Sequence, residues 1–242
     1  MVHIGIIPDG NRRWFKQNKI NYTSDNVVNF WFQKLCDLLE TGEKEGQKYL
    51  DDIQYITFYV CSIDNVHRSD GTFNFIIRFL EKICSDLFTE NLKEDLFSDN
   101  FCSAISYIRE HVKIVPIGNI DLIPTHLTKS IEKINENIKC PKVTLFLGIA
   151  YNYETDMYVE SMNKQHEISV VDNRNKYYIR EQPQIDILIR TGGEFRTSGF
   201  FPTKIVYSEF YFLKKYWPDF SIKDLMSIIK DFHCNRKRRY GC

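Results

Sequence analysis

The sequence lacks the signals of several protein classes. Its 32 basic and 32 acidic residues cancel, so no overall field draws the protein to nucleic acid or to an anionic membrane. Its seven cysteines form no Cys-x-x-Cys pair, and their odd number indicates free thiols in a reducing compartment. No apolar run is long enough to span a membrane, and no charged leader precedes an apolar run. We therefore expect a cytoplasmic protein that binds no nucleic acid.

Repeats, low-complexity tracts and linkers are also missing, which favours a single domain over residues 1–242. With 43% hydrophobic and 14% aromatic residues, the chain can build a substantial core. Buried runs typical of strands alternate with amphipathic runs typical of helices. The strands are expected at 4–7, 53–61, 113–117, 143–150, 185–189 and 206–211, and the helices at 26–48, 72–110 (interrupted over 90–99), 120–137, 156–163 and 222–232. This alternation predicts an α/β domain with a central, mostly parallel six-stranded sheet flanked by helices.

The first expected strand leads directly into a polar turn. The apolar run 4–7 ends at Pro8, which lacks a backbone donor, and Gly10 permits unusual dihedral angles. Asp9 or Asn11 is then well placed to cap a helix. The first turn of that helix carries Arg12, Arg13 and Trp14.

This turn has the composition of a phosphate site. A strand that ends in a glycine turn and opens a helix directs free backbone N–H groups at one spot, where a phosphate can bind. Arg12 and Arg13 would add charge-assisted hydrogen bonds. Asp9 would repel the phosphate unless a cation lies between them, and Mg²⁺ is the cation most often held in this way. Taken alone, such a turn is more often an ordinary strand–turn–helix with a solvated basic first turn.

Other polar residues lie where strands end or within apolar runs. Asn65 and Arg68 follow the strand at 53–61, and ligands of open parallel sheets bind at such carboxyl ends. Alone, these two are typical turn and surface residues. Glu209 lies in an aromatic run, where its charge is expensive to bury unless a metal ion or an arginine accompanies it.

A second charged loop follows the strand at 185–189. Arg190 and Arg196 flank a Gly-Gly bend and could grip a diphosphate in a bidentate manner, with Ser198 donating its hydroxyl. Glu194 could orient one of the two arginines. The alternative for this loop is a pair of arginines neutralised by acids.

Together these motifs resemble the cis-prenyltransferases, the family that includes undecaprenyl diphosphate synthase and dehydrodolichyl diphosphate synthase. The resemblance is carried by residues 3–14, 57–68, 189–212, 216–220 and 235–241. It implies an Mg²⁺-dependent transferase of isoprenoid biosynthesis that condenses isopentenyl diphosphate with an allylic primer, farnesyl or geranyl diphosphate, to a Z-polyprenyl diphosphate. It also implies a homodimer, an apolar tunnel, and a lipid product that could bring the enzyme into peripheral contact with a membrane.

Position by position, the resemblance assigns roles. Asp9 matches the Mg²⁺-binding aspartate, and Glu209 matches a glutamate that helps to coordinate the metal across a dimer interface. Asn65 matches an asparagine that positions or deprotonates the condensing isoprene, so Asp9 and Asn65 are the implied catalytic residues. The implied substrate-binding residues are Gly10, Asn11, Arg12, Arg13 and Trp14 in the opening turn, Arg68 on the same allylic diphosphate, and Arg190, Arg196 and Ser198 on isopentenyl diphosphate.

The sequence departs from the family pattern at several positions. The usual Gly-His pair after the first motif is Ser24-Asp25 here, and the arginine before it is Asn21. An acid in place of that histidine should weaken diphosphate binding. After residues 151–153 the usual Gly-Gly-Arg is replaced by Glu154-Thr155. These differences indicate a low activity or an unusual substrate.

The growing product needs an apolar tunnel, which we place between the helices at 26–48 and 72–87. Their many aromatic side chains suggest a short product, although ordinary core packing explains them equally well.

Other functions are less well supported. A non-catalytic partner subunit of a heteromeric prenyltransferase is the main alternative, but such subunits typically lose the first motif, which is intact here. A nucleic-acid or phosphoprotein binder would use the basic run 236–239, and the neutral charge counts against it. The trans-type synthases use paired Asp-Asp-x-x-Asp clusters, and the pair Asp51-Asp52 lacks the last acid.

Overall fold

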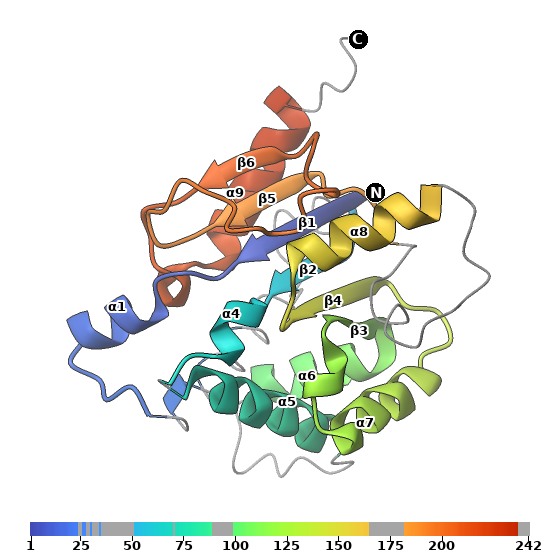
Figure 1. The fold of residues 1–242 in the computed structure, drawn as a ribbon. Helices are drawn as coiled ribbons and strands as arrows, with labels where there is room; N and C mark the ends of the chain where they lie inside the picture. Colours follow the sequence, from blue (N-terminus) through green and yellow to red (C-terminus); the bar gives the residue numbers. More distant parts are fainter. Residues whose placement is uncertain are drawn as a thin grey trace.

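A fully parallel six-stranded sheet forms the centre of the protein (Figure 1). The computed structural model describes residues 1–23, 26–27, 30, 34, 51–69, 71–88, 99–164 and 182–236. The strands are β1 (Val2–Ile7), β2 (Ile53–Tyr59), β3 (Val112–Gly118), β4 (Val143–Ile149), β5 (Ile187–Arg190) and β6 (Glu209–Phe212), in the order β3-β4-β2-β1-β5-β6. The predicted α/β architecture with a six-stranded sheet is therefore confirmed, and the sheet is parallel throughout.

The first strand lies between β2 and β5, which explains its sequence. All six of its residues are buried, because both of its edges are paired and both of its faces are covered. Such strands read as continuous apolar runs. Gly5 has no room for a side chain, since a Cβ there would lie 2.7 Å from the ring of Phe200.

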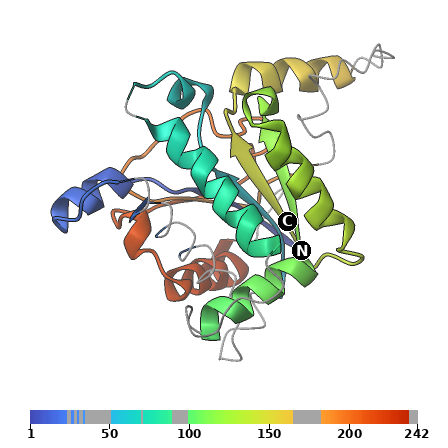
Figure 2. The same ribbon diagram turned by 90° about the horizontal axis from the view of Figure 1, so that it is seen from below.

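Helices cover one face of the sheet as a layer (Figure 2). α5 (Thr72–Phe88), α6 (Asp99–His111) and α7 (Thr125–Glu136) pack over β3 and β4, and α9 (Ile222–Asp231) packs over β1 and β5. Ile56 and Phe58 of the central strand β2 contact both groups, so the two clusters form one continuous layer.

The opposite face is closed mainly by a loop. Phe200, Phe201 and Ile205, which follow β5, pack with Phe146 and Leu188 of the sheet. α8 (Tyr153–Lys164) lies on this side as well, away from α6 and α9 in Figure 2. Helices therefore flank both faces, but aromatic side chains of a loop form much of the second core.

Several expected boundaries differ from the structure. The segment 62–68, expected as a loop, contains a short helix, α4 (Ile63–Val66), which begins with a capping box between Ser62 and Asn65. β6 starts three residues later than expected, because the preceding segment closes as a turn in which the amide of Ser208 donates to the carbonyl of Ile205. α7 begins at Thr125, after a short 3₁₀ segment, and Pro124 is its N-cap. Most of the helix expected at 26–48, and the segments 89–98 and 165–181, lie outside the described residues.

Two further expectations concern thiols and membrane spans. Cys61, Cys84, Cys140 and Cys234 are free thiols, as expected. Within the described ranges, no helix combines the length and the apolar character that a bilayer crossing requires.

Candidate active site

The carboxyl ends of the six parallel strands gather at one edge of the sheet, and the opening turn lies there. α1 (Asn11–Gln17) follows β1 after three residues. Its N-cap is Gly10 in the left-handed conformation (φ 98°), and no side chain caps the helix. The expectation that Asp9 or Asn11 caps it is therefore wrong. Asp9 accepts from the adjacent amide of Gly10 at 2.6 Å, and Asn11 donates to the carbonyl of Pro8 at 2.7 Å.

Asp9 contacts Arg190 across the neighbouring strands β1 and β5. Nη2 of Arg190 lies 2.9 Å from Oδ2 of Asp9. Partial burial alone would raise the pKa of Asp9, but the hydrogen bonds from Arg190 and Gly10 and the charges of Arg190 and Arg13 outweigh it, so this pKa is lowered. This contact brings the two charged loops together.

Arg190 links several groups of the second loop. Its side chain is only 5% exposed, and Nη1 donates to Oγ of Ser198 at 2.8 Å and to the carbonyl of Arg196. Its buried Nε has no hydrogen-bond partner among the described residues. A diphosphate at this side chain would compete with Asp9 for Nη2 and with Ser198 and the Arg196 carbonyl for Nη1.

Glu194 joins the two loops on the more exposed side. Its carboxylate lies 2.5 Å from Nη1 of Arg196 and 3.6 Å from Nη1 of Arg13. Arg13 in turn lies 3.4 Å from Asp9. The ion pairs thus form a series of alternating charges, in the order Arg196, Glu194, Arg13, Asp9 and Arg190. The alternative that the arginines are neutralised by acids is correct for these contacts.

Backbone contacts bring three distant segments together at this point. The carbonyl of Asp9 accepts from the hydroxyl of Thr191 at 2.8 Å and from the amide of Trp217 at 3.0 Å. The amide of Gly192 donates to the carbonyl of Lys215 at 2.8 Å. Gly192 has a φ of 89°, and a Cβ there would lie 3.0 Å from the backbone of Asp9. Only glycine permits this close approach without strain.

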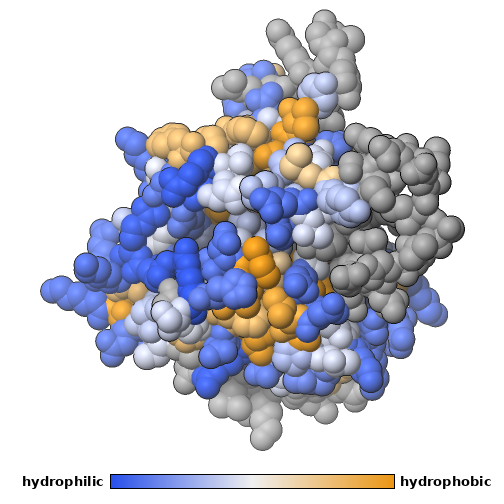
Figure 3. All heavy atoms as spheres, in the orientation of Figure 1, coloured by the Kyte–Doolittle hydropathy of each residue, from blue (hydrophilic) through white to orange (hydrophobic). Residues whose placement is uncertain are grey.

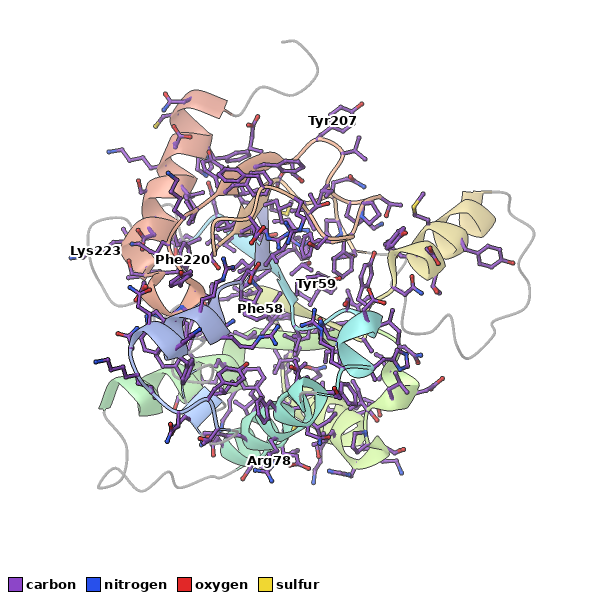
Figure 4. All side chains as sticks on the ribbon, turned by 60° about the vertical axis from the view of Figure 1, so that its left-hand side comes forward. Phe58, Tyr59, Arg78, Tyr207, Phe220 and Lys223 are labelled. Atoms are coloured by element: carbon purple, nitrogen blue, oxygen red, sulfur yellow. The ribbon has the colours of Figure 1, made fainter. Side chains whose placement is uncertain are left out.

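A cavity of about 1100 Å³ opens beside these residues. Its polar wall includes both charged loops, whereas Phe58, Phe79, Leu147 and Trp217 supply an apolar wall. Figure 4 shows Phe58 and neighbouring Tyr59, which also lines the cavity, near the centre of the molecule. In Figure 3, hydrophilic side chains cover α1 and the loop after β5, beside hydrophobic ones around α4. The cavity can therefore hold a molecule with an anionic head and an apolar tail. A tunnel that leads away from it stays a prediction.

Most of the expected substrate-binding residues line this cavity. They are Gly10, Asn11, Arg12, Arg13, Arg68, Arg190, Arg196 and Ser198. Asn65 lines it too, with its Oδ1 accepting from the amide and the hydroxyl of Ser62 at 3.0 and 3.2 Å. Both lone pairs of that oxygen are thus engaged within the protein.

Two expected residues lie elsewhere. Trp14 is not among the described residues that line the cavity, and its indole donates to Asp219 at 2.7 Å, which joins α1 to the 3₁₀ segment Trp217–Asp219. Glu209 begins the edge strand β6 in register with Ile187, at the end of the sheet opposite Arg190. Within one chain Glu209 and Asp9 do not meet, which leaves only the implied role across a dimer interface.

Several further cavity residues were not expected, among them three with polar side chains, Tyr59, Asp64 and Glu154. Tyr59 donates to the carbonyl of Ser198 at 3.4 Å, and Asp64 and Glu154 bring two carboxylates to the wall. The segments that carry Asp64 and Glu154 lie side by side, because Ser62 and Tyr151 form a parallel bridge. The signal for Tyr59 was its place at the end of a buried strand.

Comparison with models of known families now places the chain. Residues 7–241 match a family described as "Putative undecaprenyl diphosphate synthase". The chain belongs to the cis-prenyltransferase family. Its relatives include an isoprenyl transferase of Rickettsia typhi, 31% identical over 99% of this chain and 97% of the relative. A tritrans,polycis-undecaprenyl-diphosphate synthase (GGDP specific) of Sulfolobus acidocaldarius is 29% identical over 99% of this chain and 87% of the relative.

Solved structures of other proteins share the fold of this cis-prenyltransferase. Lavandulyl diphosphate synthase from Lavandula x intermedia, solved in complex with dimethylallyl diphosphate, superimposes with a TM-score of 0.70 at 24% identity, covering 99% of this chain and 98% of that one. A probable undecaprenyl diphosphate synthase from Campylobacter jejuni gives a TM-score of 0.63 at 18% identity with the same coverage. At these identities, the two structures are evidence for the fold alone.

Proposed function

We propose that this cis-prenyltransferase condenses isopentenyl diphosphate with an allylic primer, farnesyl or geranyl diphosphate, to form a Z-polyprenyl diphosphate. The observation that carries the proposal is the contact of Asp9 with Arg190. It joins two arginine-bearing loops on one cavity that also has an apolar wall of Phe58, Phe79, Leu147 and Trp217. A reaction between two diphosphates with hydrocarbon tails needs that combination.

The two diphosphates would bind on different sides of the Asp9–Arg190 contact. Arg12 and Arg13 line the cavity at the opening turn, Arg68 lines it after α4, and the three would hold the allylic diphosphate. Arg196 and Ser198 would hold isopentenyl diphosphate, assisted by the unsatisfied Nε of Arg190. Charge-assisted hydrogen bonds of this kind contribute about 1.5–3 kcal/mol each.

The bond changes then follow from this placement. The double bond of isopentenyl diphosphate attacks C1 of the allylic substrate, and the allylic diphosphate leaves with the electrons of its C–O bond. Loss of one proton from the condensed isoprene unit gives the new Z double bond. The arginines around the opening turn would stabilise the charge that develops on the leaving diphosphate.

Asn65 fits a positioning role better than that of a base. Its carbonyl oxygen is occupied by the amide and the hydroxyl of Ser62, so it cannot also accept a proton from the substrate. Its amide N–H group is left to orient the condensing isoprene. The acceptor of the proton is therefore another group, for which the released diphosphate is chemically competent.

Asp9 fits the binding of Mg²⁺ in the manner expected from the family. Among the described residues, no cluster of three His, Cys, Asp or Glu side chains could hold a metal by itself. Mg²⁺ is usually held by one or two carboxylates together with substrate phosphates, and Asp9 presents one carboxylate at the cavity. When bound, the ion would neutralise charge on the departing diphosphate.

Product growth would be favoured by burial in the apolar part of the cavity. Each added five-carbon unit gains up to roughly 4 kcal/mol at about 0.8 kcal/mol per CH₂. Glu209 would complete the metal site only in a homodimer, which we propose as the active form. The cytoplasmic location expected from the cysteines also stays a prediction.

The experiment is incorporation of labelled isopentenyl diphosphate with farnesyl or geranyl diphosphate and Mg²⁺, with products sized by chromatography. We expect Asp9→Asn to reduce incorporation at least 100-fold, because an amide keeps the shape of the side chain but loses the negative charge that attracts a cation and pairs with Arg190. Near wild-type incorporation by this variant would refute the role of Asp9. Inactivity of the lone chain that is reversed by a second subunit would favour the partner-subunit alternative.

A further inference from the structure

We propose that Tyr216 is a positioning residue that holds Arg13 over the cavity in the orientation needed for the allylic diphosphate. The inference rests on the proposed function and assigns a further residue to it. Tyr216 does not belong to the described lining of the cavity, so it would act through Arg13 rather than on the substrate.

Arg13 needs such a support because its ion pairs are long. Its guanidinium lies 3.4 Å from Asp9 and 3.6 Å from Glu194, beyond the usual 2.7–3.2 Å of a protein hydrogen bond. Its side chain is also 46% exposed. The third contact is aromatic, since the guanidinium carbon lies 5.4 Å from the centroid of the Tyr216 ring. This distance is within the range of a cation–π interaction.

The ring itself is fixed by the junction of the three segments. The residue before Tyr216 accepts from the amide of Gly192, and the residue after it donates to the carbonyl of Asp9. The ring packs directly against Gly10, where a Cβ would lie 2.5 Å from its Cδ1 atom. The aromatic face therefore has a defined place between the opening turn and the guanidinium.

An aromatic support suits a phosphate-binding arginine better than a third carboxylate would. A carboxylate occupies the N–H donors at the edge of the guanidinium, whereas a ring contacts the planar face and leaves those donors free. It also limits the rotamers of a long, exposed side chain before the substrate arrives, which lowers the entropic cost of binding. The expected effect is thus on affinity for the allylic diphosphate.

The test compares Tyr216→Phe and Tyr216→Leu in kinetics and in calorimetric binding of inorganic diphosphate and of a non-reactive allylic thiolo-diphosphate. We expect Leu to raise the allylic KM and Kd about fivefold, with kcat and the KM for isopentenyl diphosphate within twofold of wild type. Phe should restore wild-type values, because it keeps the ring. Tyr158→Leu, at an exposed tyrosine of α8, is the matched control.

A double-mutant cycle separates this role from a general structural one. In an Arg13→Ala background, Tyr216→Leu should weaken allylic binding no further. The proposal is overturned if Phe is as damaging as Leu, if both substrates are affected equally, or if the effect persists without Arg13. If the wild-type protein binds the allylic analogue but incorporates nothing, the proposed reaction fails while the Tyr216 test still applies. If it binds no diphosphate at all, both proposals are overturned.

Discussion

Arg190 shows how much chemistry one buried side chain can organise. It contacts Asp9, Ser198 and the carbonyl of Arg196, and therefore fixes one residue of the opening turn and two of the second loop. A guanidinium can do this because its donors are spread over a rigid plane. An ammonium group is a single point charge and cannot reach all three partners.

We accordingly expect Arg190→Lys to be a damaging exchange despite its conserved charge. Loss of two charge-assisted contacts at about 1.5–3 kcal/mol each should lower kcat/KM for isopentenyl diphosphate by at least tenfold. Arg196→Lys is the comparison variant, since Arg196 is 65% exposed and should matter less. Equal activity of Arg190→Lys and wild type in steady-state kinetics would contradict this assignment.

His3 is buried on the loop-covered face and predicts a pH dependence of stability. Its ring nitrogens lie 2.8 Å from the hydroxyl of Thr57 and 3.1 Å from the carbonyl of Pro183. Burial, with a smaller contribution from the charge of Lys204, lowers its pKa to about 4. Because the unfolded chain binds the proton more readily, this residue destabilises the fold as the pH falls from about 6.5 towards 4, by about 2 kcal/mol at pH 5.

Replacing His3 by Gln should remove that part of the pH dependence. Thermal unfolding followed between pH 7 and pH 4.5 would show a flatter profile for His3→Gln than for wild type, whatever the absolute stability of the variant. His126→Gln, at an exposed position on α7, provides the control. An unchanged slope for His3→Gln would rule out His3 as the titrating group.

At the level of elements, the buried strands were predicted from sequence more reliably than the turns between them. Every expected strand exists, and the four inner strands, which are paired on both edges, are the apolar runs of the sequence. The end of β2 and the start of β5 differ from the expected bounds by two residues each. The start of β6 differs by three, since Val206 and Tyr207 have strand-like composition but are exposed. Residues 62–68 look like a loop because α4 is one turn long and too short for a helical period.

The candidate site could be predicted loop by loop but not as an assembly. Asp9 and Arg190 were each identified from a strand that ends in glycines and arginines. Their contact depends on β5 being the neighbour of β1, and that order follows from tertiary packing rather than from any local pattern. The internal pairing of Arg190 also could not be predicted, because its partners come from backbone geometry and from another strand.

The turn between β1 and α1 gives a prediction that distinguishes backbone strain from a steric clash of an added side chain. Gly10 and Gly71 both have a positive φ, at 98° and 74°. A Cβ would strike the Tyr216 ring at position 10 and would meet nothing within 4 Å at position 71. Both alanine variants should lose about 1–2 kcal/mol from the conformation alone.

Only Gly10→Ala should lose more stability than this conformational cost, because its methyl group meets the Tyr216 ring. It should also bind the allylic diphosphate less tightly. Chemical denaturation of the two variants, followed by calorimetric titration with the substrate analogue, compares them directly. Equal losses of stability and unchanged binding in both variants would contradict this prediction. They would show that the Tyr216 ring moves aside for the added methyl group without loss of function.

On the scale of the whole molecule, the apolar wall of the cavity should influence product length. Phe79 of α5 is 4% exposed and lines the cavity. If its ring limits the space for the growing chain, Phe79→Leu should shift the product distribution to longer polyprenyl chains, measured by chromatography after dephosphorylation. Ile83→Val, in the same helix but outside the described lining, should keep the wild-type distribution. Identical products from Phe79→Leu and wild type would place the limit elsewhere.

The junction at the carbonyl of Asp9 also has a consequence for how the protein is made. Asp9 leaves the ribosome well before its partners Thr191 and Trp217, because they follow it far along the sequence. Contacts between such distant residues slow folding, because the entropic cost of closing the long intervening loop must be met before they form. A nascent chain therefore carries its anion-binding arginines without the junction that arranges them. The two charged loops can reach this arrangement only after Trp217 has been synthesised.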